Sequence, residues 1–301
     1  MHFLIDLIFF LFKILYRICE NACNKLCSFF VSEKHVHDEI VLITGAGHGI
    51  GRELAFQYAR LGATVVCLDI NQQMNENSSN EIAKTIGRPV YAYQCDVTDN
   101  ARVREVAEKI KKEVGDITIL INNAGIMPCY NFLNLTPDQI TSQFNVNVLS
   151  HFWTIQAFLP GMIERNYGHI VAISSIAGLA GVPHLTAYSA TKFAVKGFME
   201  SLEEELRISS NGKSLIKFTT IYPSIVNTGL CKKPKIKYPL FMGLISPKDA
   251  AAIIISAQRQ KINERSIPSY WKPLVDTFKI FPKRICEDLR DFLDFGLEPE
   301  Y

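Results

Sequence analysis

The chain has 301 residues, which is long for one α/β domain, short for two, and enough to bury a full hydrophobic core. Its formal net charge is +2 at pH 7, which is not the strong positive charge of a nucleic-acid-binding protein, so we expect no nucleic-acid partner. Its eight cysteines have neither metal-ligand spacing nor the density of a disulfide framework, which indicates a reducing compartment and no metal site.

An apolar segment begins the chain. Residues 3–18 are interrupted by three charged side chains, Asp6, Lys13 and Arg17, and on a helix these lie in a narrow polar stripe opposite a wide apolar face. A signal peptide fits poorly because no basic region precedes the run, and a spanning helix would be near the lower limit of about 17 residues. A monotopic helix in the interface fits best, so residues 1–30 are predicted to anchor the chain to a membrane or lipid-droplet surface.

Charged residues and cysteines flank this predicted anchor. The positive charges lie within and after the apolar run, which favours a downstream domain on the cytoplasmic side. Three cysteines recur every four residues, and both S-acylation and ordinary packing stay open for them: Cys19, Cys23 and Cys27.

A glycine-rich turn follows the first predicted strand, residues 39–44, and leads into a predicted helix over residues 52–61. Glycines there allow the backbone to approach a pyrophosphate closely, and the helix N-terminus favours its negative charge. The strand–turn–helix order therefore predicts a dinucleotide-binding site. The contacts predicted from this turn are Gly45, His48, Gly49, Ile50 and Gly51.

The second predicted strand, residues 63–69, ends in Asp69, eighteen residues past the last glycine of the turn. A carboxylate at this place binds the ribose diol of NAD and repels the 2′-phosphate of NADP. His48 leaves NADP open, because a basic residue in the turn can offset Asp69. The sequence favours NAD, with NADP as the alternative.

Strands and helices continue to alternate along the chain. A third predicted strand leads to Asp96-Val97, placed to flank an adenine ring, and a fourth leads to Asn122-Asn-Ala-Gly125, where a glycine lets the chain pass close to a ligand. The alternation predicts an α/β fold, a single Rossmann-type, doubly wound parallel sheet flanked by helices. Its site would lie at the carboxyl ends of the strands.

A tyrosine and a lysine lie four residues apart in Tyr188-Ser-Ala-Thr-Lys192. On a helix both side chains share one face, and a cation near a phenol lowers its pKa from about 10 toward the range of a general base. Ser175 ends a predicted buried strand, residues 169–175. A hydroxyl facing a tyrosine base predicts a site for an alcohol or a carbonyl.

Taken together, these motifs resemble those of the short-chain dehydrogenase/reductase family over roughly residues 38–270. The matching stretches are Thr44–Gly51, Asn122–Gly125, Asn147, Ser175, Tyr188 with Lys192, and Pro223–Thr228. Longer strings, such as residues 146–153, are most similar to the membrane- and lipid-droplet-associated 17β-hydroxysteroid dehydrogenases and to the epidermal retinol dehydrogenases. The N-terminal apolar segment is similar too.

The resemblance implies roles for individual residues. Asn147 would hold a water beside Lys192 in a proton relay, and Ser175, rather than Ser174, would hydrogen-bond the substrate oxygen. The implied catalytic set is Asn147, Ser175, Tyr188 and Lys192. The full predicted set of cofactor-binding residues is Gly45, His48, Gly49, Ile50, Gly51, Asp69, Asp96, Val97, Asn123, Ala124, Gly125, Tyr188, Lys192, Pro223, Ile225 and Thr228.

The predicted function is NAD-dependent oxidation of a lipophilic secondary or allylic alcohol, of the hydroxysteroid or retinol class, with Tyr188 as general base. Two alternatives stay open: an NADPH-dependent carbonyl reductase, and a lipid-droplet structural or recruiting protein with incidental catalysis. We expect a homodimer at the endoplasmic reticulum membrane or a lipid droplet, with the catalytic domain facing the cytoplasm.

Two C-terminal features have more than one interpretation. A run of lysines at residues 232–237 is either a solvated face or a contact with anionic lipid headgroups. Residues 271–301 form an amphipathic, aromatic tail that could cover the site, join a dimer or touch lipid.

Overall fold

The computed structural model describes residues 12–13, 15–16 and 33–299, and the chain divides into two compact units, residues 1–34 and 35–301. Most of the predicted anchor, and all three cysteines beside it, lie outside the described residues. The four described positions within it, Phe12, Lys13, Leu15 and Tyr16, are helical. Among the described residues, no helix has both the length and the apolar character that crossing a bilayer requires.

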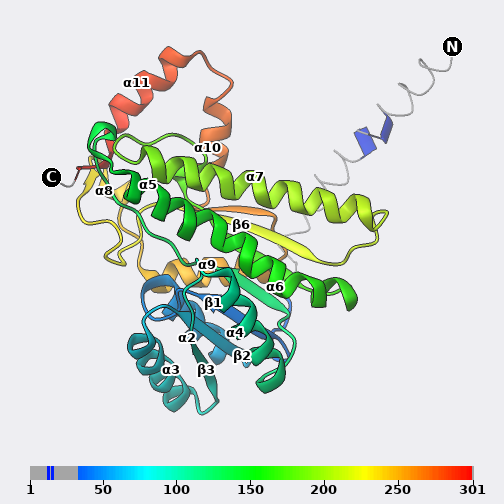
Figure 1. Cartoon of the computed structure of the whole chain (residues 1–301). Coiled ribbons are helices and arrows are strands. Elements are labelled where there is room, and N and C mark those ends of the chain that lie inside the picture. The colour runs from blue at the N-terminus through cyan, green and yellow to red at the C-terminus, as the bar shows by residue number, and fades with distance from the viewer. Residues whose placement is uncertain (1–11, 14, 17–32, 300–301) are drawn as a thin grey trace. The chain divides into compact units, whose positions relative to one another are not determined.

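The second unit contains a seven-stranded sheet, in which every paired strand is parallel to its neighbour, in the order β3-β2-β1-β4-β5-β6-β8 (Figure 1). The strands are β1 (Ile40–Thr44), β2 (Thr64–Asp69), β3 (Val90–Gln94), β4 (Ile119–Asn122), β5 (His169–Ile173), β6 (Lys217–Pro223) and β8 (Glu264–Ile267). The order reverses between β1 and β4, which is where open α/β sheets form their ligand crevice. The predicted doubly wound parallel sheet is confirmed.

Helices cover both faces of this sheet, which is why its central strands are apolar on both sides. One face packs against α2 (Gly49–Arg60), α3 (Gln72–Ile86) and α9 (Pro247–Arg259). The other packs against α4 (Asn100–Glu113), α6 (Ser150–Glu164) and α7 (Thr186–Ser209). Within β1, Val41 and Ile43 belong to the first core and Leu42 to the second, as the two-residue period of a strand requires.

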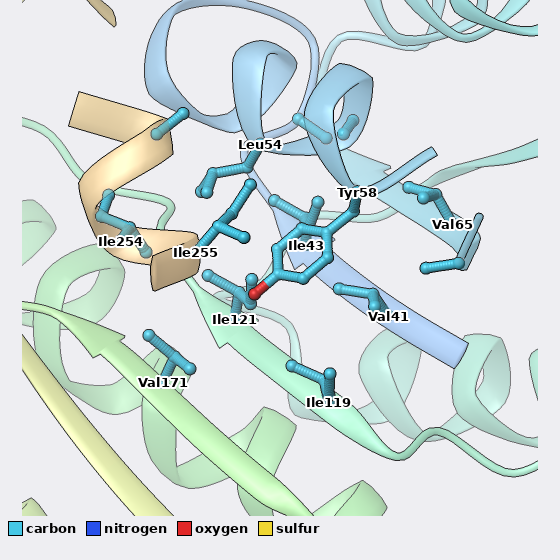
Figure 2. Close-up of a cluster of buried hydrophobic side chains, with 14 of the residues drawn as sticks. Val41, Ile43, Leu54, Tyr58, Val65, Ile119, Ile121, Val171, Ile254 and Ile255 are labelled. Atoms are coloured by element: carbon cyan, nitrogen blue, oxygen red, sulfur yellow. The ribbon is translucent and has the colours of Figure 1, made fainter. Parts of the chain in front are cut away.

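Figure 2 shows the first core, where Ile43 of β1 lies among side chains of α2 and α9. Leu54 and Tyr58 come from α2 and Ile254 from α9, and all three are fully buried. The Tyr58 hydroxyl donates to Gln258 Oε1 at 3.0 Å, so its polar atom is satisfied inside the core. This packing fixes the start of α2 against the end of β1.

Helix α2 begins at Gly49, three residues earlier than the sequence predicts. His48 is its N-terminal flanking residue, in an extended conformation and without a side-chain cap. The last three residues of the glycine turn, 49–51, therefore form the start of the helix, where a Cβ on Gly49 would meet the Thr228 side chain and one on Gly51 would meet the Gly45 carbonyl.

A π-helical turn, Asn145–Leu149, joins α5 (Pro137–Phe144) to α6. Helix α5 begins with a capping box, in which Thr136 Oγ1 accepts from Gln139 N and Gln139 Oε1 accepts from Thr136 N. Turns of this type inside α-helices are frequent at functional sites. This one carries Asn147.

The C-terminal tail belongs to the second unit and pairs with an earlier segment of it. It contains α10 (Trp271–Phe278), α11 (Lys283–Leu293) and β9 (Phe295–Leu297), shown in orange and red in Figure 1. Strand β9 pairs antiparallel with β7 (Pro234–Ile236), which precedes the short helix α8 (Pro239–Met242). The tail was predicted as amphipathic, but the sequence did not indicate this strand pair.

Candidate active site

A cavity of about 400 Å³ lies at the carboxyl ends of the sheet strands, on the side where the strand order reverses. Its lining comes from the strand ends and loops at the carboxyl side of β1 to β6, from the first turn of α2, from α7 and from β9. The lining includes polar residues of the glycine turn and α7, such as His48 and Lys192, and an apolar cluster in which Leu185 packs near Leu297 of β9. The cavity can therefore take a ligand that is polar at one end and apolar at the other.

The glycine turn is closed tightly against the end of β1. Gly45 and Gly49 have φ angles of +65° and +59°, in the left-handed region that favours glycine. A Cβ atom on Gly51 would lie 2.0 Å from the Gly45 carbonyl oxygen, so no side chain fits there. Gly45, His48, Gly49 and Ile50 line the cavity, whereas Gly51 packs inside the turn behind them.

Asp69 is held against this turn. Its Oδ2 accepts a hydrogen bond from Gly47 N at 2.8 Å and its Oδ1 accepts one from Asn71 N at 2.9 Å. A Cβ on Gly47 would lie 3.0 Å from Asp69 Oδ2, so the close approach depends on glycine. The carboxylate is nearly buried and lines the cavity, as the ribose-binding prediction requires.

The loops after β3 and β4 form the neighbouring walls. Asp96 Oδ1 accepts from Thr98 N and Thr98 Oγ1, and both Asp96 and Val97 line the cavity. Asn123 Nδ2 donates to the Thr44 carbonyl at 2.9 Å, which ties β4 to β1. The lining also includes the remaining predicted cofactor residues, Asn123, Ala124, Gly125, Pro223, Ile225 and Thr228.

Tyr188 and Lys192 face the cavity from one side of α7, and both are nearly buried. Lys192 Nζ lies 5.6 Å from the centroid of the Tyr188 ring and donates to the Ile173 carbonyl at 2.9 Å. Ser175 lines the cavity and its Oγ accepts from Ala177 N at 3.1 Å. Ser174 also lines the cavity, but its hydroxyl donates a hydrogen bond to the Lys192 carbonyl at 2.9 Å.

Burial is the largest influence on the pKa values of Tyr188 and Lys192. It raises the pKa of Tyr188 to about 12, against the opposing effect of the Ser175 hydroxyl, and it lowers the pKa of Lys192 to about 8. The prediction that Lys192 brings the phenol below its ordinary pKa is therefore wrong for this site. The reason is that burial disfavours the phenolate more than the hydrogen bond with Ser175 favours it.

Asn147 lies behind the cavity wall, outside its lining. Its Oδ1 accepts from Ile126 N and its Nδ2 donates to the Ile126 carbonyl, both at 2.9 Å. Nδ2 also donates to Thr191 Oγ1 at 3.2 Å, so Asn147 links the loop after β4 to α7. A Cβ on Gly125 would lie 3.3 Å from Asn147 Oδ1 and 3.6 Å from Lys192 Nζ, so glycine leaves both groups room beside the loop.

His151, one helical turn further along α6, is a buried polar residue that sequence reasoning did not single out. Neither ring nitrogen has a hydrogen-bond partner among the described residues. Burial and the nearby Lys192 charge lower the pKa of His151 to about 3, so it is neutral at pH 7.

Several lining residues were not predicted individually. Met127 lies in the loop after β4, Cys231 lies in the segment between β6 and β7, and Phe295, Gly296 and Leu297 belong to β9. The last three are more than 100 residues from Tyr188 in the sequence, and no motif links them to it. Their place in the cavity results from the pairing of β9 with β7.

The chain belongs to the short-chain dehydrogenase/reductase family. The family model described as short chain dehydrogenase matches residues 39–238, which span the sheet from β1 through β6 and every residue of the cavity lining except those of β9. Members of this family are NAD(P)-dependent oxidoreductases, and the chain is therefore an enzyme of that class that binds NAD(P).

Its relatives include named dehydrogenases. Short-chain dehydrogenase/reductase family 16C member 6 of Bos taurus is 43% identical over 257 residues, 85% of this chain and 80% of the relative. Epidermal retinol dehydrogenase 2 of Mus musculus is 40% identical over 289 residues, 96% and 92% of the two chains. Human 17-beta-hydroxysteroid dehydrogenase 13 is 35% identical over 286 residues, 94% and 92%.

Solved structures share the fold. A short chain dehydrogenase/reductase from Burkholderia phymatum, in complex with NAD, superposes with a TM-score of 0.71 at 23% identity, covering 80% of this chain and 93% of that one. An alcohol dehydrogenase from Thermococcus sibiricus, complexed with 5-hydroxy-NADP, gives 0.67 at 23% identity, covering 76% and 95%.

Proposed function

We propose that the chain oxidises a lipophilic secondary or allylic alcohol, of the hydroxysteroid or retinol class, with NAD. The observation that carries the proposal is the position of Ser175, Tyr188 and Lys192 in one cavity, between the glycine turn and an apolar wall. The names of two relatives, a retinol dehydrogenase and a 17-beta-hydroxysteroid dehydrogenase, support that substrate class.

The residues present fit a nicotinamide dinucleotide. The glycine turn leaves room that side chains would fill, and the first turn of α2 presents backbone N–H groups to the cavity, which suits a pyrophosphate. Asp69 would hold the adenosine ribose, and Ile225 and Thr228 would hold the carboxamide. The bound cofactor supplies the hydride acceptor.

The protein's own groups would orient the alcohol and move its proton. For oxidation, Tyr188 must first lose its own proton through the relay; as the phenolate it then takes the hydroxyl proton as general base, and Ser175 hydrogen-bonds the oxygen and stabilises the charge that develops on it. Lys192, protonated at pH 7 with a pKa of about 8, favours the phenolate during the transfer. Asn147 holds the loop and helix around Lys192, and a water in its vicinity would complete the relay.

The substrate end is apolar. Leu185, Leu230 and Leu297 line the cavity beyond Tyr188, and they favour a hydrocarbon body over a sugar or an acid. An alcohol with one hydroxyl on a ring or on a long apolar chain matches this polarity. Among known metabolites, steroids and retinoids have that form.

Replacement of Tyr188 tests the proposal. Tyr188→Phe removes the proton acceptor without changing the shape of the site, so kcat for oxidation should fall at least about 100-fold. NADH binding, followed by its fluorescence, should stay within about twofold. NADH formation by the purified protein is measured across a panel of retinols, hydroxysteroids and fatty alcohols.

The matched control is Tyr130→Phe, which removes a phenol hydroxyl outside the cavity lining. This variant should keep wild-type turnover. Activity of Tyr188→Phe within tenfold of wild type would overturn the assignment of the base.

Carbonyl reduction with NADPH is the second candidate, and the raised pKa of Tyr188 favours it. A phenol with a pKa of about 12 is protonated at pH 7, which is the form that donates a proton to a carbonyl oxygen. Rates in both directions at pH 7, with each cofactor, separate the two candidates. A chain that reduces ketones with NADPH and forms no NADH from any alcohol in the panel belongs to the second class.

We also propose that the chain acts at the endoplasmic reticulum membrane or at a lipid droplet, as a homodimer with its catalytic domain facing the cytoplasm. The support is the apolar character of residues 3–18 and the positive charges that follow them.

A further inference from the structure

The apolar end of the cavity is closed by the chain's own C-terminal strand. Strand β9 pairs with β7 in an antiparallel register in which Lys235 is opposite Gly296 and Ile236 is opposite Phe295. All three residues of β9 line the cavity. The tail therefore supplies part of the wall around the reacting groups, although α10 and α11 separate it from the sheet (Figure 1).

Polar contacts hold β9 in place at both ends. Lys235 Nζ pairs with Asp294 Oδ1 at 2.6 Å, just before the strand. Just after it, Glu298 N donates to the Lys233 carbonyl at 3.1 Å, and the Glu298 carbonyl accepts from Cys129 Sγ at 3.5 Å. The strand is thus attached to the β7 segment and to the loop after β4.

Part of the lysine run serves this attachment. Besides the ion pair of Lys235, Lys237 Nζ donates to the Phe292 carbonyl at 3.2 Å and lies 5.7 Å from the Phe292 ring centroid. These two lysines contact the tail, so the hypothesis of a purely solvated face does not describe them.

Side chains of β9 pack around the proposed base. Leu297 lies against the apolar cluster that contains Cys129, Leu185 and Tyr188. Phe295 stacks at 5.4 Å, centroid to centroid, on Trp271, which is 7% exposed. Trp271 and the strand pairing therefore keep Phe295 in the wall, and Leu297 packs against the cluster to which Tyr188 belongs.

We propose that Phe295 and Leu297 are specificity-determining residues, which receive the apolar body of the substrate while its hydroxyl lies at Tyr188. The preferred substrate is then an alcohol with a large hydrocarbon body, and a short alcohol gains nothing from β9. This inference rests on the proposed function, because it concerns the alcohol of that reaction. It assigns the C-terminal tail to the substrate site.

Kinetics of Leu297→Ala and Phe295→Ala test the proposal in the full-length protein. Removing an apolar contact of this size should raise KM for a retinol or a hydroxysteroid about tenfold. KM for NAD, and kcat/KM for a four-carbon secondary alcohol, should stay within about twofold. The control is Ile285→Ala, which truncates an exposed apolar side chain of α11 outside the cavity lining.

Equal losses for large and small alcohols, or no loss for either, would contradict a specificity role. A defect in folding would appear as a lowered Tm and weakened NADH binding, and Leu297→Met then serves as the second variant. Because Met fills a similar volume, it should restore KM for the large alcohol to within about threefold of wild type. A tenfold defect that persists in Leu297→Met would also count against the proposal.

A second measurement does not depend on catalysis. Cys129 is 5% exposed, and its thiol donates a hydrogen bond to the Glu298 carbonyl of the tail. Deleting residues 295–301, or replacing Lys235 by Glu, should increase the rate of Cys129 alkylation by N-ethylmaleimide at least about threefold, whereas Lys235→Arg should not. The modified site is identified by peptide mass spectrometry.

The two measurements separate the failure of each idea. If alkylation increases but no alcohol in the panel is oxidised, the strand placement stands and the proposed function fails. If alcohols are oxidised but neither alkylation nor the KM for large alcohols responds to changes in β9, the inference is overturned and the proposed function stands.

Discussion

Lys192 is a charged group held where little water reaches it. Its side chain is 3% exposed, its ammonium donates to the Ile173 carbonyl, and burial lowers its pKa from 10.5 to about 8. Since the folded pKa is below the unfolded one, the charged form is destabilised by folding. The penalty is complete below pH 8 and fades as the pH rises from 8 to 10.5.

Lys192→Met should therefore stabilise the fold while it abolishes activity. The pKa shift corresponds to about 3 kcal/mol at pH 7, and the Ile173 carbonyl left without its donor costs about 1 kcal/mol, so the expected gain is about 2 kcal/mol. Urea unfolding at pH 7 measures it. The same comparison at pH 10.5 should show a small loss of stability, because the penalty has faded and the Ile173 carbonyl still lacks its donor. A variant less stable at pH 7 would refute the argument.

Asp69 is the residue on which cofactor preference depends. Its carboxylate is fixed by Gly47 N and Asn71 N and faces the cavity, where it would repel a 2′-phosphate. Asp69→Asn removes the charge and keeps the size, so the preference for NAD over NADP, as a ratio of kcat/KM values, should fall at least tenfold. Wild-type protein that prefers NADP, or an unchanged ratio in the variant, would show that another group decides.

At the scale of elements, the start of α2 depends on glycine at one position above all. Gly51→Ala would place a Cβ 2.0 Å from the Gly45 carbonyl, and the turn must open to accept it. We expect a loss of about 1–3 kcal/mol in the free energy of unfolding and at least tenfold weaker NADH binding. Chemical denaturation and fluorescence titration measure the two effects.

Gly197→Ala is the matched control for this substitution. Gly197 is an exposed position of α7, and among the described residues a Cβ there would meet nothing within 4 Å apart from its chain neighbours and the nearby backbone of its own helix. Alanine in the middle of a helix should stabilise the protein by about 0.5–1 kcal/mol. Opposite signs at the two positions would confirm that the turn, and not glycine content, is what matters.

At the scale of the whole molecule, residues 35–301 form a unit with its own two-sided core and a cavity lined entirely from within it. Deleting residues 1–30 should therefore leave Tm within about 3 °C and NADH binding unchanged. The proposed anchor would be lost, so the truncated protein should move from the membrane or droplet fraction to the supernatant. A truncated protein that still floats with droplets would place the anchor elsewhere.

Local patterns in the sequence determined the fold class of this protein and the position of its site. Strand runs, the glycine turn and the Tyr188–Lys192 spacing each involve residues close together in the chain, and the physics that relates them is local. Sheet type and the position of the crevice then follow from the alternation of strands and helices. The parallel sheet, the family and the enzyme class were predictable for that reason.

Only the tertiary structure decided the quantities that depend on distant residues. The pKa of Tyr188 depends on how completely the surrounding elements exclude water, so its direction could not be obtained from a four-residue spacing. Asn147 lies in a π-helical turn, which no local motif predicted, and hydrogen-bonds Ile126 and Thr191 from there. Likewise, β9 reaches the cavity because it pairs with β7, and strand pairing across some sixty residues is a property of the folded chain.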